Sequence, residues 1–324
     1  AAFGAAGGAV IACIYLWFKY IHIRREMGIK KVKTNTEVLN QILKIAIPIS
    51  LGATVGTIMN LIDSILVPQK LMESGVANAT ALYGQLTGKA AVLVNIPLTL
   101  SMAICTSLIP IISEHYILNR KEEMQSKINI AMKLSAVIAL PCTLGMFCLA
   151  GPIMKLVFFD KYEGIEILRY LSISIPFIIV TQTTTSILQA TNHYIRPVIN
   201  LVIGCVVKIV LTAVLVPIPS INVFGAVIAS VSAYIVVTIL NLIALKTKTK
   251  CKVSIYDSFV KPGYASILMI GVVLFSYNFI MERIDSNSIS CLLSIFMGII
   301  IYIIAILLFK VFNVDEIKNR LVRK

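Results

Sequence analysis

Long apolar runs are the feature of this sequence that most constrains its fold, because each is about as long as a membrane requires. A helix needs about 20 apolar residues to cross the hydrocarbon of a bilayer. With 58% hydrophobic and 14% charged residues, the chain has more apolar surface than a water-soluble core can bury. About nine transmembrane helices are predicted, at residues 1–23, 42–67, 86–113, 128–150, 166–190, 197–217, 221–245, 259–281 and 288–312. The runs do not alternate as barrel strands do, so the predicted fold class is an all-α integral membrane protein.

Basic residues gather in every second loop between these spans. The basic segments are residues 24–44, 114–127, 191–196 and 246–261, followed by the C-terminal tail. Cytoplasmic loops carry the excess of lysine and arginine, so the pattern predicts an N-terminus outside the cell and a cytoplasmic C-terminus. The net charge of +14 is then explained by topology and by anionic lipids at the cytoplasmic loops, rather than by nucleic acid.

The loops and the cysteines argue against catalytic or metal chemistry. The longest predicted loops have about 20 residues, too few for a soluble catalytic domain, so the chain is not expected to be an enzyme. The seven cysteines and three histidines are scattered without a C-x-x-C pair, as expected of small apolar residues inside helices. No metal or other cofactor is therefore predicted.

Two ionisable side chains lie inside predicted spans, Asp63 in the second and Lys208 in the sixth. A charged group at the centre of a membrane helix costs at least about 2.5–3.5 kcal/mol, so both are expected to face the protein interior or a wet cavity. For Lys208, a structural lysine that donates to backbone carbonyls is the alternative. Asn60 lies one turn before Asp63 on the same helix face. Gly52 and Gly56 form a G-x-x-x-G pattern that favours close helix packing.

Further polar candidates lie in the third and fifth spans. Lys89 is near the outer start of the third span, where it either reaches the membrane interface or lines the mouth of a cavity. Gln182, Ser186 and Gln189 share one face of the fifth span and indicate an interhelical network or a wet surface. The prolines within the spans permit bends of the kind common in alternating-access transporters.

Three segments resemble a known family. They are ILKIAIPISLGATVGTIMNLIDSILVPQKL (42–71), LYGQLTGKAAVLVNIPLTLSMAICTSLIPIISE (82–114) and SILQATNHYIRPVINLVIGCVVKIVL (186–211). They are similar to the stage V sporulation protein B group, polysaccharide-biosynthesis flippases of the multidrug/oligosaccharidyl-lipid/polysaccharide exporter superfamily. Members usually have fourteen helices, in two six-helix lobes and a final pair, and this chain resembles helices six to fourteen of that MATE-like plan.

The resemblance implies a domain division and a function. Residues 1–23 would be the last helix of the first lobe, 24–41 a basic cytoplasmic linker, 42–245 the six-helix second lobe, and 246–324 the final pair with a cytoplasmic tail. The implied function is transfer of a polyprenyl-pyrophosphate-linked oligosaccharide, a precursor of cell wall, spore cortex or surface polysaccharide, to the outer leaflet of the bacterial plasma membrane. Lys89 is the first candidate to bind the pyrophosphate, because a lysine is a mobile point charge. Asp63 either pairs with a lysine or couples transport to a cation or proton.

Three other functions remain open from the sequence. A multidrug or organic-cation antiporter of the same superfamily would favour acidic and aromatic cavity residues, and the single Trp17 and one deep carboxylate speak mildly against it. A membrane-embedded polymerase or ligase needs a large external loop with clustered charged residues, and the predicted external loops are short. A non-transporting scaffold for cell-wall synthesis is the third.

Overall fold

The computed structural model describes residues 2–26, 36–159, 161–251, 253–254 and 256–311. Almost all of these residues are helical, and the described part of the chain contains no strand. The all-α prediction is therefore confirmed. The central part of the predicted 24–41 linker and the tail beyond residue 311 lie outside the described residues.

The chain divides into two units, residues 1–47 and 48–324. The first holds α1 (Ala2–Glu26) and the start of α2 (Thr36–Glu73). The second holds the rest of α2 and all later elements. These are α3 (Ala79–Gly84), the π-helix η1 (Gln85–Ala90), α4 (Ala91–Ile117), α5 (Lys121–Cys148), α6 (Ala150–Phe158), α7 (Ile165–Leu171), the 3-10 turn η2 (Ser172–Ser174), α8 (Ile175–Ala190), α9 (Ile195–Leu215), α10 (Phe224–Thr249), the π-helix η3 (Tyr256–Val260), α11 (Lys261–Ile284) and α12 (Asn287–Leu308).

Eight helical segments of the described chain are long and apolar enough to cross a membrane. They correspond to the second to ninth predicted spans, and the first predicted span is helical as α1. Three of the eight are composite. The third predicted span joins α3, η1 and α4, the fifth joins α7 and α8 through η2, just before Pro176, and the eighth joins η3 and α11.

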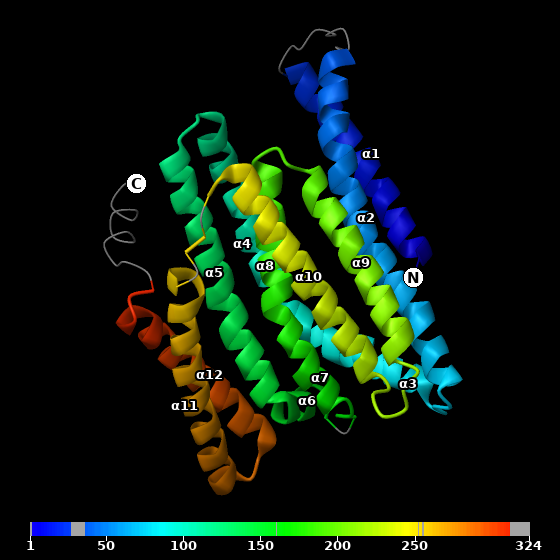
Figure 1. The fold of residues 1–324 in the computed structure, drawn as a ribbon, viewed down its shortest axis with the longest axis vertical. Coiled ribbons are helices and arrows are strands. Elements are labelled where there is room, and N and C mark those ends of the chain that lie inside the picture. Colours follow the sequence, from blue (N-terminus) through cyan, green and yellow to red (C-terminus); the bar gives the residue numbers. More distant parts are fainter. Residues whose placement is uncertain (1, 27–35, 160, 252, 255, 312–324) are drawn as a thin grey trace. The chain divides into compact units, whose positions relative to one another are not determined.

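The helices of the second unit run up and down between two ends (Figure 1). The turns that follow α4 and α8 and the C-terminus of α10 lie at one end, here called the 119 end after Asn119. The segments before α7 and between α9 and α10 lie at the opposite end, called the 222 end after Asn222. The described turns after α4 and α8 and the end of α10, which belong to three of the segments predicted to be basic, thus lie together at the 119 end, as alternate loops of a membrane bundle should.

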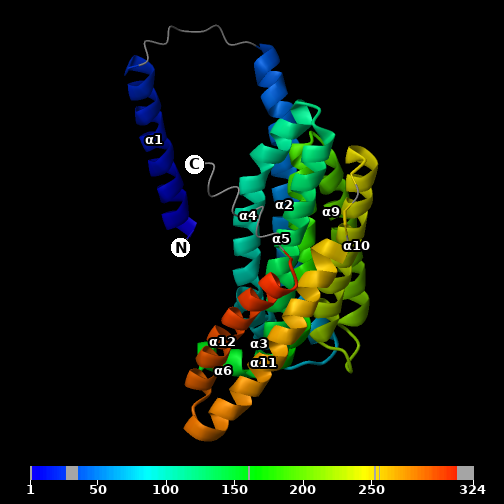
Figure 2. The ribbon, with the colours of Figure 1, turned by 90° about the vertical axis from the view of Figure 1, so that its left-hand side faces the viewer.

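The helix α8 lies at the centre of the bundle, in contact with α4, α5 and α10. Its large buried side chains include Ile175, Ile179, Ile187 and Leu188. The last two helices, α11 and α12, pack side by side and against α5 and α6 (Figures 1 and 2). Tyr302 of α12 fixes this contact by donating a 2.9 Å hydrogen bond to the Val137 carbonyl of α5.

Candidate transport site

The two ionisable residues predicted inside the membrane meet in an ion pair between α2 and α9. The Lys208 ammonium donates a hydrogen bond to an Asp63 carboxylate oxygen. The Lys208 side chain is 8% exposed and that of Asp63 19% exposed. Removing one partner of a buried pair leaves an uncompensated charge, whereas the paired groups largely offset each other's desolvation.

Apolar groups pack next to this pair. Met59 of α2 packs with Cys205 of α9 and Ala233 of α10, about one helical turn along the chain from the charges. Three helices, α2, α9 and α10, therefore place the pair next to an apolar cluster.

Lys89 lies on the π-helical segment η1 and is held by the segment that precedes α7. Its ammonium donates to the Lys161 carbonyl at 2.5 Å and to the Glu163 carboxylate at 2.7 Å. The same nitrogen lies 5.8 Å from the centre of the Phe158 ring. The hydrogen bond from Lys89 holds the pKa of the Glu163 carboxyl below its usual value. Lys89 is thus bound to the protein at the 222 end, and not free in a cavity.

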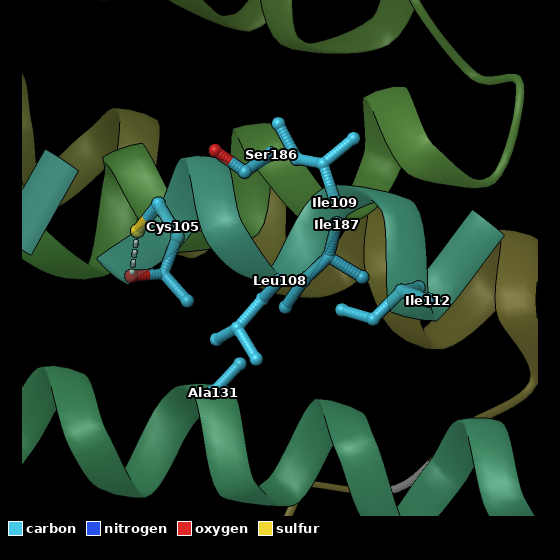
Figure 3. A pocket seen from close by; sticks show the side chains of 8 residues that line it. Cys105, Leu108, Ile109, Ile112, Ala131, Ser186 and Ile187 are labelled. Atoms are coloured by element: carbon cyan, nitrogen blue, oxygen red, sulfur yellow. Dashed lines mark hydrogen bonds between the residues drawn. The ribbon is translucent and has the colours of Figure 1, made fainter. Parts of the chain in front are cut away.

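The predicted stripe on α8 does not form one network. Gln182 has a buried side-chain oxygen without a hydrogen-bond partner among the described residues. Ser186 lines a small pocket between α4, α5 and α8 with Leu108, Ile109 and other apolar side chains (Figure 3). Gln189 is half-buried further along the helix. The three side chains share a face, as the spacing predicted, but the structure does not join them.

The interhelical network of α8 comes instead from its threonines. Asn241 of α10, fully buried, donates to the hydroxyls of Thr184 at 3.2 Å and Thr185 at 3.1 Å. It accepts a 2.8 Å hydrogen bond from Asn200 of α9. The amides inside apolar runs of α9 and α10 were a signal that would have pointed to this network.

A second hydroxyl contact joins α8 to α10. Thr181 and Thr238 lie 3.0 Å apart, and Thr238 also donates to the Phe177 carbonyl at 2.9 Å. Because each polar group has a partner, these contacts hold the helices together without a net charge. The described residues contain no group of three or more histidine, cysteine or acidic side chains able to hold a metal ion.

Residues 1–284 match the protein family described as lipid II flippase MurJ. The chain belongs to this family. Two curated proteins of Bacillus subtilis (strain 168) are among its relatives. Stage V sporulation protein B is 24% identical over 97% of this chain and 61% of its own length. Lipid II flippase MurJ is 27% identical over 75% of this chain and 46% of its own length. The chain thus spans about half to three-fifths of the length of these relatives.

Solved structures show the same fold as this MurJ-family chain. A lipid II flippase MurJ in an inward closed conformation superposes with a TM-score of 0.59 and 20% identity, covering 86% of this chain and 56% of that one. An outward-facing multidrug-resistance MATE transporter of the MOP superfamily gives 0.55 and 19%, covering 86% and 68%. The predicted resemblance to the stage V sporulation protein B group and to a MATE-like plan is confirmed. The MurJ family is a family of multi-pass membrane transporters rather than of catalytic enzymes.

The part of α2 that carries Asp63 also presents an exposed polar face in this MurJ-family fold. Thr57, Asn60 and Ser64 are exposed at spacings that place them on one side of the helix. The two glycines of the G-x-x-x-G pattern on α2 have different surroundings. A Cβ at Gly52 would lie 3.3 Å from Val198 of α9, whereas a Cβ at Gly56 would meet nothing within 4 Å. Only the first glycine therefore lies at a close helix contact.

Proposed function

We propose that the protein moves a lipid-linked oligosaccharide, a precursor of cell wall, spore cortex or surface polysaccharide, from the inner to the outer leaflet by alternating access. Membership of the MurJ family over residues 1–284 is the observation that carries this proposal. The bacterial plasma membrane is the proposed location. Sugar and pyrophosphate cannot cross hydrocarbon unaided, because burial of unpaired polar and charged groups is too costly.

The exposed polar faces of two helices support a wet pathway along this part of the protein. One is the α2 face that carries Asn60. The other is on α4, where Asn95, Thr99 and Thr106 are exposed within an apolar helix. Polar side chains are rare against lipid, so faces of this kind belong against water or other protein. We assign them to the cavity wall that a second lobe completes.

The proposed domain plan follows the family resemblance. Residues 1–23 end a first lobe, 24–41 link the lobes, 42–245 form the second lobe, and 246–324 form the final pair and tail. The polyprenyl-pyrophosphate-linked sugar is the substrate, and anionic lipids contact the basic loops. In this plan the cavity has a wall from each lobe. Residues 1–324 alone are then expected not to restore export in a host that lacks its own flippase, and full activity would contradict the two-lobe mechanism.

Two roles for Lys89 can be distinguished by experiment. As a pyrophosphate ligand, Lys89 must leave Glu163 when substrate arrives. As a tether, it stays bound to Glu163 and holds η1 to the segment before α7. Export of lipid-linked sugar should be measured for Lys89→Gln and Glu163→Gln in the full-length protein, in a flippase-depleted host. Loss of export in Lys89→Gln with export kept in Glu163→Gln supports the ligand role. Equal loss in both supports the tether, and wild-type export from Lys89→Gln contradicts both.

Asp63 and Lys208 are proposed to serve the transport cycle as a pair. The pair supports a lysine, rather than a bound metal cation, as the group that neutralises Asp63 in this state. If export by the wild type depends on a sodium gradient, and this dependence is lost only in Asp63→Asn, the assignment is contradicted. A dependence on a proton gradient would agree with it, because either member of the pair can exchange a proton.

The proposed orientation places the 119 end in the cytoplasm. Ala77 lies in the α2–α3 turn at the opposite end, and Lys246 lies on α10 at the 119 end, both exposed. A membrane-impermeant maleimide added to intact cells should label Ala77→Cys and not Lys246→Cys, with the unmodified chain as background. The native Cys251 is a poor probe because it is only 5% exposed. Labelling of Lys246→Cys alone would reverse the topology.

A further inference from the structure

A small hollow at the 119 end is lined by residues from three helices. It has a volume of about 190 Å³ and lies between the end of α4, the start of α5 and the end of α10. Its lining residues are His115, Tyr116, Asn119, Lys121, Met124, Lys248, Thr249 and Lys250. We call it the basic hollow. None of the residues assigned to transport lines it.

The basic hollow carries an uncompensated positive charge. Lys121, Lys248 and Lys250 are exposed, and none of them forms an ion pair with an acidic side chain in the described part of the chain. The nearby carboxylate of Glu123 lies 3.6 Å from Arg120 and 3.0 Å from His115 Nδ1. The lining itself contains no acidic residue. Three cations from two helices therefore converge on one concave site.

The backbone fixes two of the lining residues in place. Asn119 and Lys250 have φ of +55° and +56°, the left-handed conformation that ends α4 and α10. Thr249, between Lys248 and Lys250, accepts a hydrogen bond from the Cys251 N–H at 3.2 Å, and Cys251 is buried. This hydrogen bond links the turn after α10 to the buried Cys251, so the backbone of Lys248 and Lys250 is held in place.

Exposed apolar side chains flank the hollow where lipid chains would run. Ile111, about one turn before His115 on α4, is 39% exposed. Ile243, two turns before Lys250 on α10, is 54% exposed. A soluble anion gains nothing from these side chains, whereas a phospholipid places its phosphate above and its acyl chains against them. Basic pockets between transmembrane helices bind lipid head groups on this principle.

We propose that the basic hollow binds the head group of an anionic glycerophospholipid from the leaflet at the 119 end. Lys121, Lys248 and Lys250 bind the phosphodiester as point charges, and the Asn119 amide and Tyr116 hydroxyl supply further donors. The exposed isoleucines on α4 and α10 hold the acyl chains. This site goes beyond the proposed transport function and does not depend on it, because it lies outside the residues assigned to the substrate.

The test compares two sets of charge removals at the same end of the full-length protein. The first set removes all three lysines that line the hollow, by the changes Lys121→Gln, Lys248→Gln and Lys250→Gln. The matched control is Lys127→Gln, Arg196→Gln and Lys246→Gln, three basic residues at the 119 end that do not line it. Native mass spectrometry in detergent measures single adducts of dioleoyl phosphatidylglycerol and dioleoyl phosphatidylcholine. Size-exclusion profiles and helix content show that each variant is folded.

Wild type and the control set should bind phosphatidylglycerol about tenfold or more tightly than phosphatidylcholine, given three local cations. The hollow set should lose that preference, and the corresponding Lys→Arg set should keep it. An undiminished preference in the hollow set, or an equal loss in the control set, would overturn the proposal. Displacement of phosphatidylglycerol by millimolar glycerol 1-phosphate would also overturn it, because the site would then recognise a soluble phosphate and not a lipid.

Discussion

The helices α8 and α2 have similar compositions of apolar residues, yet the bundle uses them in opposite ways. In the segment that contains α8, 61% of the most apolar 18-residue stretch is buried, against 6% in α2. Buried threonines join α8 to its neighbours through neutral hydrogen bonds. The mid-membrane polar contact of α2 is the Asp63–Lys208 ion pair. Packing and neutral hydrogen bonds therefore hold α8, whereas α2 combines an ion pair with the packing of Met59, Val67 and Leu71.

This difference teaches which element is suited to move. A helix buried on most of its surface cannot shift without opening voids in a close-packed interior. A helix with little buried surface and one charge pair can change its angle at the cost of few contacts, and its attachment responds to protonation or to a nearby anion. Within the described residues α8 is therefore the more constrained helix, and in the proposed two-lobe plan the exposed face of α2 is the cavity wall.

The largest effect is expected from breaking the charge pair that attaches α2. Asp63→Asn or Lys208→Gln leaves one buried charge uncompensated and should destabilise the fold by about 3–5 kcal/mol. The double change removes both charges and should be more stable than either single variant. A double-mutant cycle scored by unfolding in detergent and by protein abundance measures the coupling. Additive losses would show that the pair does not hold α2.

The next effect separates close packing from open surface through two glycines. A Cβ at Gly225 of α10 would lie 2.7 Å from the backbone of Leu215 and Val216, whereas a Cβ at Gly56 of α2 would meet nothing within 4 Å. Gly225→Ala should therefore destabilise the bundle by about 1–3 kcal/mol through overpacking. Gly56→Ala should be neutral or slightly stabilising, because alanine favours helix. Equal unfolding temperatures for Gly225→Ala and Gly56→Ala would contradict the difference in packing between α2 and the core.

A smaller effect is expected from the neutral network around α8. Asn241→Leu removes two donated bonds and strands the Asn200 amide, and should cost about 1–2 kcal/mol. Asn60→Leu, on the exposed face of α2, is the matched amide change and should leave unfolding in detergent unaltered. A larger loss from Asn60→Leu than from Asn241→Leu would place the structural amide on α2 and contradict the network.

The smallest effect concerns pH at the 222 end. The hydrogen bond from Lys89 lowers the pKa of Glu163 below the ordinary 4.5. The charged carboxylate is therefore favoured in the folded protein, and its contribution is complete above about pH 4.5 and is lost as pH falls through the lowered pKa. Glu163 is exposed, so solvent screens the effect. Wild type should unfold at a higher temperature than Glu163→Gln at pH 7, and this difference should shrink as the pH falls below 4.5. A constant difference would assign the effect to another group.

The sequence predicted the spans and the burial of charge well, because both follow from hydropathy and length. Asp63 and Lys208 were each expected to face inward, and their contact agrees with that expectation. The sequence did not predict that Lys89 would bind Glu163, because the two residues lie 74 positions apart and periodicity reports faces rather than partners. It also missed the threonine contacts of α8. A threonine that bonds its own backbone and one that bonds another helix look alike in a sequence.

The ion pair has a consequence for how the chain enters the membrane. Asp63 and Lys208 lie 145 residues apart, and synthesis at about 5–20 residues per second separates their emergence by roughly 7 to 30 seconds. During that time α2 must insert without its counter-ion, and its apolar residues, with a mean hydropathy of 1.8 over the most apolar 18-residue stretch, offset the cost of the carboxylate. The arrival of α9 then completes the pair. Biogenesis thus passes through an intermediate in which Asp63 of α2, the first of the eight candidate spans, has no counter-ion until α9, the fifth, enters the bilayer.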